Sequence, residues 1–528
     1  MSKLKIDFSI ILILAVVVFG CGKEIKITPT DTSVAQKPVE QIMSTATDSS
    51  DTAQSTVLSV EEMSESDAAT DSRDIDDLAK NAVNIDAPNS VSGDKNSGEL
   101  VKGNKSTSCS TQWTRLSGVS NSITGAMSVA VDIACNGYIT GGTSGNLDGQ
   151  IATGTQDAFL IKYNWNGVKQ WTKLEGISNK QTTGYSIVLD SFSNIYIAGT
   201  ISQPVQTIVI KYNSSGVKQW AKIIGPSSGG YNTFGSGIAV DSSGNSYITG
   251  WTNANLNGQV NAGLRSAFVI KYNSSGVIQW TKFSGNGGTT EGRGIATDSS
   301  GNIYITGMAA DYIAGNPGIP GTLDGQTLIA HGDVVFVIKY NSSGVKLWTR
   351  VLGVINNGIS YSYTEGNGIA VDPYGNSYVT GFTNGNLGGQ WLPASYGVFV
   401  IKYDSNGVNQ WTRLSGVSGA YTDGRGITVD SLGNIYTAGW TGGNLDGQPK
   451  VGIIDAFVIK YNSNGIKQWT RLSGVSNAQT VANGITVLPP ALTYPNGSTY
   501  YVTGYTFGNL GGQTLTGTYD AFLFEKNW

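Results

Sequence analysis

A tryptophan that recurs along the chain divides most of it into similar units. Each copy stands in a strand-like segment similar to Gln-Trp-Thr, and the last unit runs on to Trp528. Self-similarity at this scale indicates a propeller, a solenoid or an array built from one supersecondary unit. The recurring residues number seven: Trp113, Trp171, Trp220, Trp280, Trp348, Trp411 and Trp469.

Every unit contains the same four apolar runs. They are five to seven residues long and rich in Val, Ile, Thr, Tyr and Phe, which is strand composition. In the third unit they are 237–241, 246–250, 267–272 and 277–283. Several runs are apolar at consecutive positions, so we expect both faces of each sheet to be covered by neighbouring sheets.

Two kinds of tight turn join these runs. Runs one and two are joined by Asp-x-x-Gly-Asn, as at 241–245, and runs three and four by Asn-x-x-Gly, as at 273–276. Asp or Asn followed by Gly three residues later suits a hairpin in which Gly takes a positive φ. Seven repeats of four antiparallel strands predict an all-β, seven-bladed β-propeller.

The phase of the repeats predicts how the ring closes. The repeats begin with a lone fourth strand, 112–116, and end with a third strand, 520–527, that has no fourth after it. We therefore expect the final blade to combine 484–526 with 112–116, which removes the open sheet edges. A solenoid would need no such split.

The N-terminus is typical of an export signal. Lys3 and Lys5 precede an apolar run over 8–20, and about 20 Å of helix is too short to span a bilayer. The run ends at Val18-Phe-Gly-Cys21, which resembles a bacterial lipobox, in which the cysteine is lipidated. The alternative is a secreted soluble protein with a chance cysteine.

Between the signal and the repeats lies a segment without any aromatic residue. Residues 22–112 contain no Phe, Tyr or Trp and twice as many acidic as basic residues. Such a composition does not bury enough apolar surface to fold. We predict a signal peptide over 1–20, a disordered acidic tether over 21–111 with lipidated Cys21, and the propeller over 112–528.

The repeat units resemble a known family. The segments Gly-Ile-Ala-Val-Asp-Ser-Ser-Gly-Asn and Phe-Val-Ile-Lys-Tyr-Asn-Ser-Ser-Gly-Val-Lys-Gln-Trp are similar to SBBP repeats, the seven-bladed propeller repeats of bacterial surface lipoproteins. Lipobox, tether and propeller together resemble a spirochaete lipoprotein family. This resemblance implies a palmitate-bearing outer-membrane lipoprotein at the cell surface, and adhesion to host matrix as its role. The repeat region carries nearly equal numbers of acidic and basic residues, so the sequence shows no clustered basic surface of the kind that binds nucleic acid. We expect a monomer without a cofactor.

The longer loops should all lie at one end of the blades. We call the end with the two tight turns the tight-turn face, and the end with the loops between runs two and three and between blades the variable face. Aromatic and Arg residues on loops are common hot spots of binding; the alternative is that they pack loop against loop. The candidate ligand-binding residues are Asp311, Tyr312, His331, Trp391, Tyr396, Trp251, Trp440, Arg293 and Arg425.

Two further features are candidates for a cation site and a disulfide. An Asn-Leu-Asp-Gly-Gln motif recurs, with Asp148, Asp324 and Asp446 as potential Ca²⁺ ligands, but the Asp is Gly or Asn in other copies, so a structural turn is the preferred interpretation. Cys109 and Cys135 should both lie on the tight-turn face, where a disulfide between them is one outcome and two free thiols the other.

The sequence offers little catalytic chemistry. His331 is the only histidine, so a multi-histidine zinc site is excluded, and no phosphate- or dinucleotide-binding motif stands in a suitable context. We predict no metal and no catalytic residue. Glu291, Glu365 and Asp423 precede inner strands near the mouth of the channel, and a carboxylate-based site there stays open.

Three functions follow from these features. The first is a surface adhesin or scaffold whose variable face binds a host matrix protein, an envelope protein or a glycan. The second is an envelope carbohydrate or ester lyase or hydrolase that uses carboxylates at the channel mouth. The third is a periplasmic envelope assembly factor.

Overall fold

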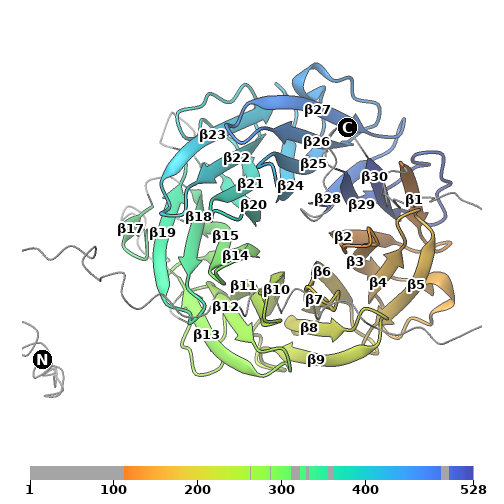
Figure 1. Cartoon of the computed structure of the whole chain (residues 1–528), viewed down its shortest axis with the longest axis horizontal. Coiled ribbons are helices and arrows are strands. Elements are labelled where there is room, and N and C mark those ends of the chain that lie inside the picture. The colour runs from red at the N-terminus through yellow and green to blue at the C-terminus, as the bar shows by residue number, and fades with distance from the viewer. Residues whose placement is uncertain are drawn as a thin grey trace, which may run out of the picture. The chain divides into compact units, whose positions relative to one another are not determined.

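The structure, a computed structural model, describes residues 112–526 except 262, 286, 311–320, 329–331, 355–360 and 489–498. In this part of the chain, strands form seven four-stranded antiparallel sheets that surround a central axis as blades (Figure 1). The prediction of an all-β, seven-bladed propeller is confirmed. Residues 1–111 lie outside the described residues, and with them the predicted signal, tether and Cys21.

The first strand of each blade lies at the axis and the fourth at the rim. The innermost strands are β2 (Thr124–Val131), β6 (Thr182–Leu189), β10 (Thr233–Val240), β14 (Thr290–Thr297), β20 (Thr364–Val371), β24 (Thr422–Val429) and β28 (Thr480–Val487). The second strands are β3 (Gly137–Thr143), β7 (Ile195–Ile201), β11 (Ser246–Thr252), β15 (Ile303–Ala310), β21 (Ser377–Thr383), β25 (Ile435–Thr441) and β29 (Tyr500–Thr506). The third strands are β4 (Asp157–Tyr163), β8 (Gln206–Tyr212), β12 (Ser266–Tyr272), β18 (Asp333–Tyr340), β22 (Gly397–Tyr403), β26 (Asp455–Tyr461) and β30 (Asp520–Lys526). The outermost strands are β5 (Lys169–Glu175), β9 (Lys218–Ile224), β13 (Ile278–Ser284), β19 (Lys346–Leu352), β23 (Asn409–Gly416), β27 (Lys467–Ser473) and β1 (Trp113–Ser117).

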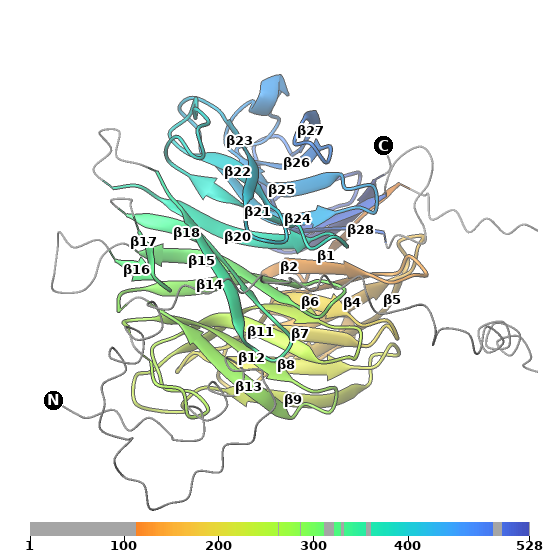
Figure 2. The ribbon, with the colours of Figure 1, turned by 60° about the vertical axis from the view of Figure 1, so that its left-hand side comes forward.

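The N-terminal strand completes the last blade, as predicted. The seventh sheet has the order β1-β30-β29-β28, and β1 pairs antiparallel with β30 from Trp113↔Glu525 to Ser117↔Ala521. The start of β1 therefore lies beside the end of β30, at the tight-turn face. Figure 2 shows the blades in a tilted view; β1 and β28 form the two opposite edges of the seventh sheet.

The innermost strands begin earlier than predicted. The sequence places the first run of blade three at Gly237, but β10 begins at Thr233, and β28 likewise begins at Thr480 rather than Gly484. A shift in register between Gly235 and Gly237 leaves Ser236 unpaired, which is a β-bulge. A bulge interrupts the alternation of side chains, so the first half of the strand does not read as a continuation of the second. All seven innermost strands carry the bulge at the same position.

The Asp-x-x-Gly-Asn turn is held by one saturated carboxylate. In blade three, Oδ1 of Asp241 accepts hydrogen bonds from the backbone N–H of Ser243 at 3.0 Å and of Asn245 at 2.9 Å. Its Oδ2 accepts from Asn245 Nδ2 at 2.8 Å and from the hydroxyl of Tyr247 at 2.9 Å. The same pattern recurs at Asp132, Asp190, Asp298, Asp372 and Asp430. These carboxylates are structural because every oxygen already serves the turn.

Neighbouring blades are joined at the rim by the recurring tryptophan. The Trp220 ring lies over Gly276 in the Asn-x-x-Gly turn of the next blade, where an added Cβ would come within 2.9 Å of it. Trp220 Nε1 and Lys211 Nζ both donate to the backbone carbonyl of Ser274 in that turn, at 3.2 and 3.1 Å. We call this contact between a Trp, a Lys and the turn of the next blade the tryptophan latch. Trp280 with Lys271 and Trp348 with Lys339 repeat it.

The latch also closes the ring. Trp113 of β1 donates from Nε1 to the carbonyl of Trp165 in blade one at 3.1 Å, and its ring lies over Gly167. The ring centroids of Tyr163 and Tyr501, from blades one and seven, each lie 6.1 Å from that of Trp113. The lone N-terminal strand therefore pairs with one blade and latches the other.

The Asn-Leu-Asp-Gly-Gln motif forms a turn whose third residue needs a left-handed backbone. Asp148, Asp324 and Asp446 have φ of 54°, 51° and 52°, and the equivalent Asn257 and Gly388 have 49° and 56°. Asp, Asn and Gly tolerate this conformation best, which explains their exchange between blades. Each Asp binds a Lys and a Thr of the outermost strand; in blade one the partners are Lys169 at 2.7 Å and Thr172 at 2.5 Å.

Cys135 lies in the first tight turn of blade one, at the position of the turn Gly, and is fully buried. It takes part in a disulfide, and the chain's other cysteines, Cys21 and Cys109, lie outside the described residues. The pairing of Cys109 with Cys135 stays a prediction. None of the described residues lies in a helix long and apolar enough to cross a membrane.

The closing latch generates a stability prediction. Trp113→Ala removes the side chain that contacts blades one and seven, so we expect the free energy of unfolding to fall by about 3–5 kcal/mol, as for other buried Trp truncations. Trp165→Ala is the matched control because its side chain is 45% exposed and only its backbone serves the latch. Denaturant unfolding of both variants measures the difference; equal losses would contradict this role for Trp113.

Candidate functional site

The seven bulges direct one side chain from each blade into the central channel. A bulge re-aims the residue that it leaves unpaired, and all seven such residues line one cavity of about 490 Å³. Their identities differ from blade to blade, in contrast to the repeated turns. In blade order they are Met127, Tyr185, Ser236, Arg293, Asn367, Arg425 and Asn483.

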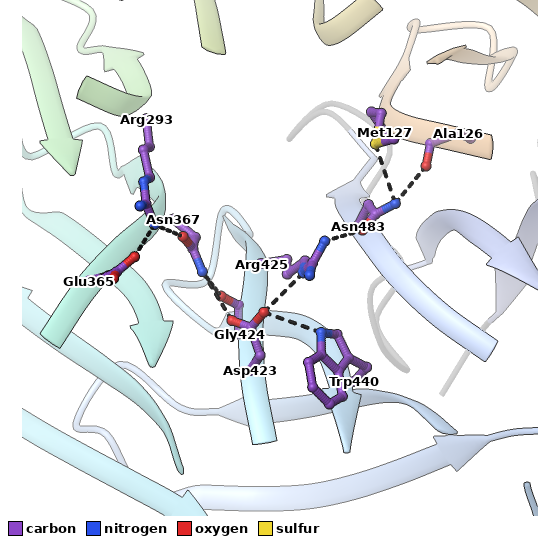
Figure 3. Close-up of polar contacts among 10 residues, drawn as sticks. All are labelled: Ala126, Met127, Arg293, Glu365, Asn367, Asp423, Gly424, Arg425, Trp440 and Asn483. Carbon is purple, nitrogen blue, oxygen red and sulfur yellow. Dashed lines mark hydrogen bonds and ion pairs between the residues drawn. The ribbon is translucent and has the colours of Figure 1, made fainter. Parts of the chain in front are cut away.

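Polar contacts link these residues around half of the channel (Figure 3). Arg293 Nη1 lies 2.5 Å from Oε2 of Glu365 and donates to Oδ1 of Asn367 at 3.0 Å. Asn367 Nδ2 then donates to Oδ1 of Asp423 at 3.0 Å and to the carbonyl of Gly424 at 2.9 Å. These bonds join blades four, five and six.

The network continues from blade six to blade one. Arg425 donates through Nε to Oδ2 of Asp423 at 3.0 Å and through Nη1 to Oδ1 of Asn483 at 3.0 Å. Asn483 Nδ2 donates to the carbonyl of Ala126 at 2.8 Å. Oδ2 of Asp423 also accepts from Trp440 Nε1 at 3.2 Å. Burial raises the pKa of Asp423, although Arg425 and Trp440 oppose that rise.

A second cavity, which we call the aromatic pocket, lies between blades five and six. Its volume is about 320 Å³, and most of its lining is apolar. Thr422, Glu365 and Asp423 supply its polar atoms, and Phe382 and Asp423 also line the channel cavity, so the two cavities share a wall. The aromatic residues that line it are Tyr363, Phe382, Tyr396, Tyr421 and Trp440.

Four of the five aromatic rings of this pocket form one connected cluster. Tyr396 and Tyr421 stack with centroids 4.5 Å apart and ring planes 23° apart. Tyr396 also lies 6.4 Å from Tyr363 and 6.2 Å from Phe382. Offset and tilted pairs at such distances are mutually stabilising, so the pocket is formed without a ligand. Tyr421 is nevertheless 57% exposed, which leaves one ring face available.

A carboxyl group with a raised pKa lies beside the pocket. Asp333, at the start of β18, is buried and accepts a hydrogen bond from the Tyr361 hydroxyl at 3.1 Å. Burial, followed by the negative charge of Glu365, raises the pKa of Asp333 to about 6. At the same strand position in blade one, Asp157 accepts backbone N–H bonds from Thr153 and Gly154, both at 2.7 Å.

Another aromatic group lies across the channel, on blades two and three. Tyr185 lies 4.9 Å from Phe234, and Phe234 and Trp251 stack at 5.9 Å with an interplanar angle of 2°. The guanidinium of Arg265 lies 4.2 Å from the centroid of Trp251 and pairs with Glu291. Tyr185, Phe234 and Trp251 form an aromatic wall of the channel cavity.

The structure brings some of the predicted ligand-binding residues together. Tyr396 and Trp440 line the aromatic pocket, and Trp251, Arg293 and Arg425 line the channel cavity. Glu291 and Asp423 lie in the channel wall, and Glu365 and Asp423 in the pocket wall. Trp391 is 72% exposed and lines neither cavity. Outside the described residues lie Asp311, Tyr312, His331 and Cys109.

Sequence reasoning missed half of the aromatic pocket. Phe382 and Trp440 occupy the same position of the second strand as Trp251, directly after a Gly, so this recurrence was a usable signal. Tyr363 and Tyr421 each stand directly before the Thr that opens an innermost strand. The sequence assigns that position to a loop, because the bulge interrupts the alternation of side chains and so hides the start of the strand.

No group of three or more His, Cys, Asp or Glu side chains in the described part of the chain is arranged to hold a metal ion. What the site offers instead is an apolar surface with hydroxyl, carboxylate and guanidinium groups at its edges. Such a combination binds small polar molecules that have apolar faces.

The SBBP beta-propeller repeat family matches five segments of the chain, which together cover less than half of it. They are 170–203, 219–257, 279–310, 347–388 and 410–446. These matches support the assignment of the repeats to the SBBP family. They lie in the second to sixth of the seven units.

A curated relative comes from Acanthamoeba polyphaga mimivirus. It is the uncharacterized WD repeat-containing protein L264, 28% identical over 397 residues, which cover 63% of this chain and 26% of the viral protein. The chain thus matches about a quarter of the length of that relative.

Solved propeller structures are similar at low identity. A chain of the mitotic checkpoint complex has a TM-score of 0.42 at 9% identity, covering 84% of this chain and 100% of that chain. The polysaccharide lyase Uly1 has a TM-score of 0.40 at 12% identity, covering 76% and 89%. A polysaccharide lyase PL25, an ulvan lyase, has 0.38 at 11% identity, covering 74% and 93%.

The raised pKa of Asp333 generates a pH prediction. Asp333 contributes stability that is full below its unfolded pKa near 3.8 and is lost as the pH rises through about 6. Asp333→Asn keeps an acceptor for Tyr361 and stays neutral, so at pH 7.5 we expect it to stabilise the fold by about 1–2 kcal/mol. The gain should disappear near pH 4.

Denaturant unfolding at both pH values measures this gain. Asp157→Asn is the matched control, because its carboxylate accepts two backbone N–H groups and its loss should destabilise the fold at pH 7.5. A variant Asp333→Asn that is less stable than the wild type at pH 7.5 would overturn the assignment.

Proposed function

We propose that this propeller is a glycan-binding scaffold and that the aromatic pocket is its sugar site. The observation that carries this proposal is a ready-made cavity of about 320 Å³ in which five aromatic side chains meet two carboxylates and a threonine. Its volume lies at the lower end of the range for ligand pockets, about 300–1,000 Å³.

The chemistry of a pyranose fits these surfaces. One face of a sugar ring presents C–H groups with partial positive charge, which pack on the negative face of an aromatic ring. The hydroxyls around the rim of the sugar donate hydrogen bonds, and carboxylates are strong acceptors of them. Tyr421 offers an accessible ring, while Glu365 and Asp423 supply the acceptors.

The scaffold supports such a site from a rigid base. The pocket residues lie at the variable-face ends of strands whose opposite ends are fixed by the repeated tight turns. A site of this kind pays little ordering entropy when a ligand binds. Protein ligands, the other part of the adhesin hypothesis, would need a broader contact surface of about 800 Å² per partner.

The carboxylates favour binding over acid–base catalysis. A lyase or hydrolase needs a carboxyl group that exchanges a proton with its substrate. Glu365 pairs with Arg293, and Asp423 is occupied by Arg425, Asn367 and Trp440. These ion pairs and hydrogen bonds hold both carboxylates in place as acceptors, and the binding experiment below separates the two functions through analysis of the products.

We also propose that Cys21 carries a lipid that anchors the scaffold at the outer surface of the cell. The apolar run before Cys21 and the lipobox-like sequence support this. The strand that receives the upstream segment, β1, begins at the tight-turn face, opposite the aromatic pocket. Attachment at that face leaves the pocket available to a ligand from the medium.

The sugar site generates a binding prediction. Tyr396→Ala and Tyr421→Ala each remove one ring of the stacked pair, so we expect each to weaken glycan binding at least tenfold, because a hot-spot truncation costs roughly 1–4 kcal/mol. Tyr374→Ala is the matched control, since Tyr374 is 83% exposed and lies in a tight turn of the opposite face. A glycan array identifies the ligand, and calorimetry measures each affinity.

Three results would count against the proposal. They are the absence of glycan binding, equal losses in all three variants, and saturable binding of a matrix or envelope protein that ignores both pocket substitutions. New reducing or unsaturated sugar ends after incubation with the glycan would instead indicate the enzyme alternative.

The anchor generates a separate prediction. Cys21→Ser should move the protein from the membrane fraction to the soluble fraction and abolish incorporation of labelled palmitate, because stable anchoring requires the acyl chains. The control is Cys135→Ser, which leaves the proposed lipid site intact. Protease added to intact cells should degrade the wild type; complete protection would favour the periplasmic assembly factor.

A further inference from the structure

The channel cavity is built differently from the aromatic pocket that it adjoins. Its volume is about 490 Å³, and two of the seven bulge residues that line it are Arg293 and Arg425. Phe382 and Asp423 belong to both cavities, so a ligand longer than one sugar ring can reach from one to the other.

The charges of this cavity are layered. Ion pairs in its wall join Arg265 to Glu291, Arg293 to Glu365 and Arg425 to Asp423, and in each pair at least one partner lines the cavity. The three guanidinium side chains are 45%, 28% and 37% exposed, and their carboxylate partners 11%, 12% and 15%. The guanidinium groups are therefore more exposed than their carboxylate partners, and Arg293 and Arg425 present N–H donors to a ligand in the channel.

Arg425 retains donors for a ligand. Its Nε and Nη1 bind Asp423 and Asn483, but its Nη2 has no hydrogen-bond partner within the described ranges. The two partners hold the guanidinium plane in place (Figure 3). A fixed guanidinium with free N–H groups recognises a carboxylate or a sulfate by charge-assisted hydrogen bonds.

The aromatic wall of the same cavity supplies a complementary surface. Phe234 and Trp251 present parallel rings, and Tyr185 packs against Phe234. An acidic sugar unit combines a ring that stacks on such a wall with an anionic group that a guanidinium binds. A neutral sugar would offer the free donors of Arg425 only hydroxyl oxygens, which are weaker acceptors than a carboxylate or a sulfate.

We propose that the glycan bound by this propeller is acidic. Its carboxylate or sulfate group is bound in the channel mouth by Arg425, with Arg293 beside it. A neighbouring sugar unit of the same chain occupies the aromatic pocket. This inference rests on the proposed function and adds the chemical class of the ligand and a second subsite.

The test compares acidic oligosaccharides with neutral counterparts of the same length. Probes are oligogalacturonate, hyaluronan and chondroitin sulfate fragments, each also in carboxyl-reduced form, and chondroitin sulfate in desulfated form as well. We expect at least one acidic probe to bind and to lose at least tenfold in affinity when its anionic group is removed. Reduced and desulfated forms distinguish a carboxylate from a sulfate.

Substitution of the guanidinium provides the second arm. Arg425→Gln should weaken binding of the acidic probe at least tenfold and bring it to the level of the neutral probe, which should itself change less than threefold. Arg425→Lys should retain part of the preference because it keeps the charge. Arg413→Gln is the matched control, since Arg413 binds the carbonyls of Gly465 and Asn464 in the next blade at the rim.

A measurement on the wild type covers the case in which Arg425→Gln fails to fold. Binding of the acidic probe should weaken as NaCl rises from 50 to 500 mM, whereas binding of a neutral probe should not. Neutral glycans that bind as tightly as acidic ones, without dependence on salt, would overturn this inference and leave the proposed function intact. No binding of any glycan would overturn both.

Discussion

The recurring tryptophan latch is the contact on which the ring depends. Six of the seven rim Trp rings cover a Gly in the turn of the next blade, and Trp220, Trp280 and Trp348 each share a carbonyl acceptor with a Lys of their own blade. Two constraints require a Gly at position 276: its φ is +76°, and any Cβ there would collide with Trp220. One indole thus fixes the position of one sheet relative to the next at five junctions, and Trp113 makes the sixth such contact where the ring closes.

The latch also explains why the two faces of the propeller differ. Turns on the tight-turn face are bound to their neighbours and to their own carboxylates, so their residues are determined by the fold. Loops on the variable face repeat such contacts in only some blades, as the Asp of the Asn-Leu-Asp-Gly-Gln turn does. Differences between blades therefore gather there and in the bulges, and the aromatic pocket and the channel cavity lie where the sevenfold symmetry is broken.

Much of the fold was predictable because the same residues recur at the same positions of each blade. Trp113 at one end and the incomplete unit at the other sufficed to place the closing strand. The site was less predictable, since Tyr363, Tyr396 and Tyr421 come from separate loops and meet only after the blades are assembled. The bulge was missed for a physical reason: it breaks the two-residue period from which strands are recognised.

The bulge gives each of the seven blades one channel-facing position, and the residue at this position differs between blades although the fold is symmetric. In blades four to seven these residues alternate as Arg293, Asn367, Arg425 and Asn483, and the alternation has a physical basis. Each Asn accepts a bond from an Arg and donates to the next blade, a double task that an amide performs and that a carboxylate or a guanidinium does not. An aspartate there would lose the donor, and an arginine would place like charges side by side. Because each amide satisfies both neighbours, the network holds two guanidinium groups in fixed positions at the mouth of the channel while separating their charges.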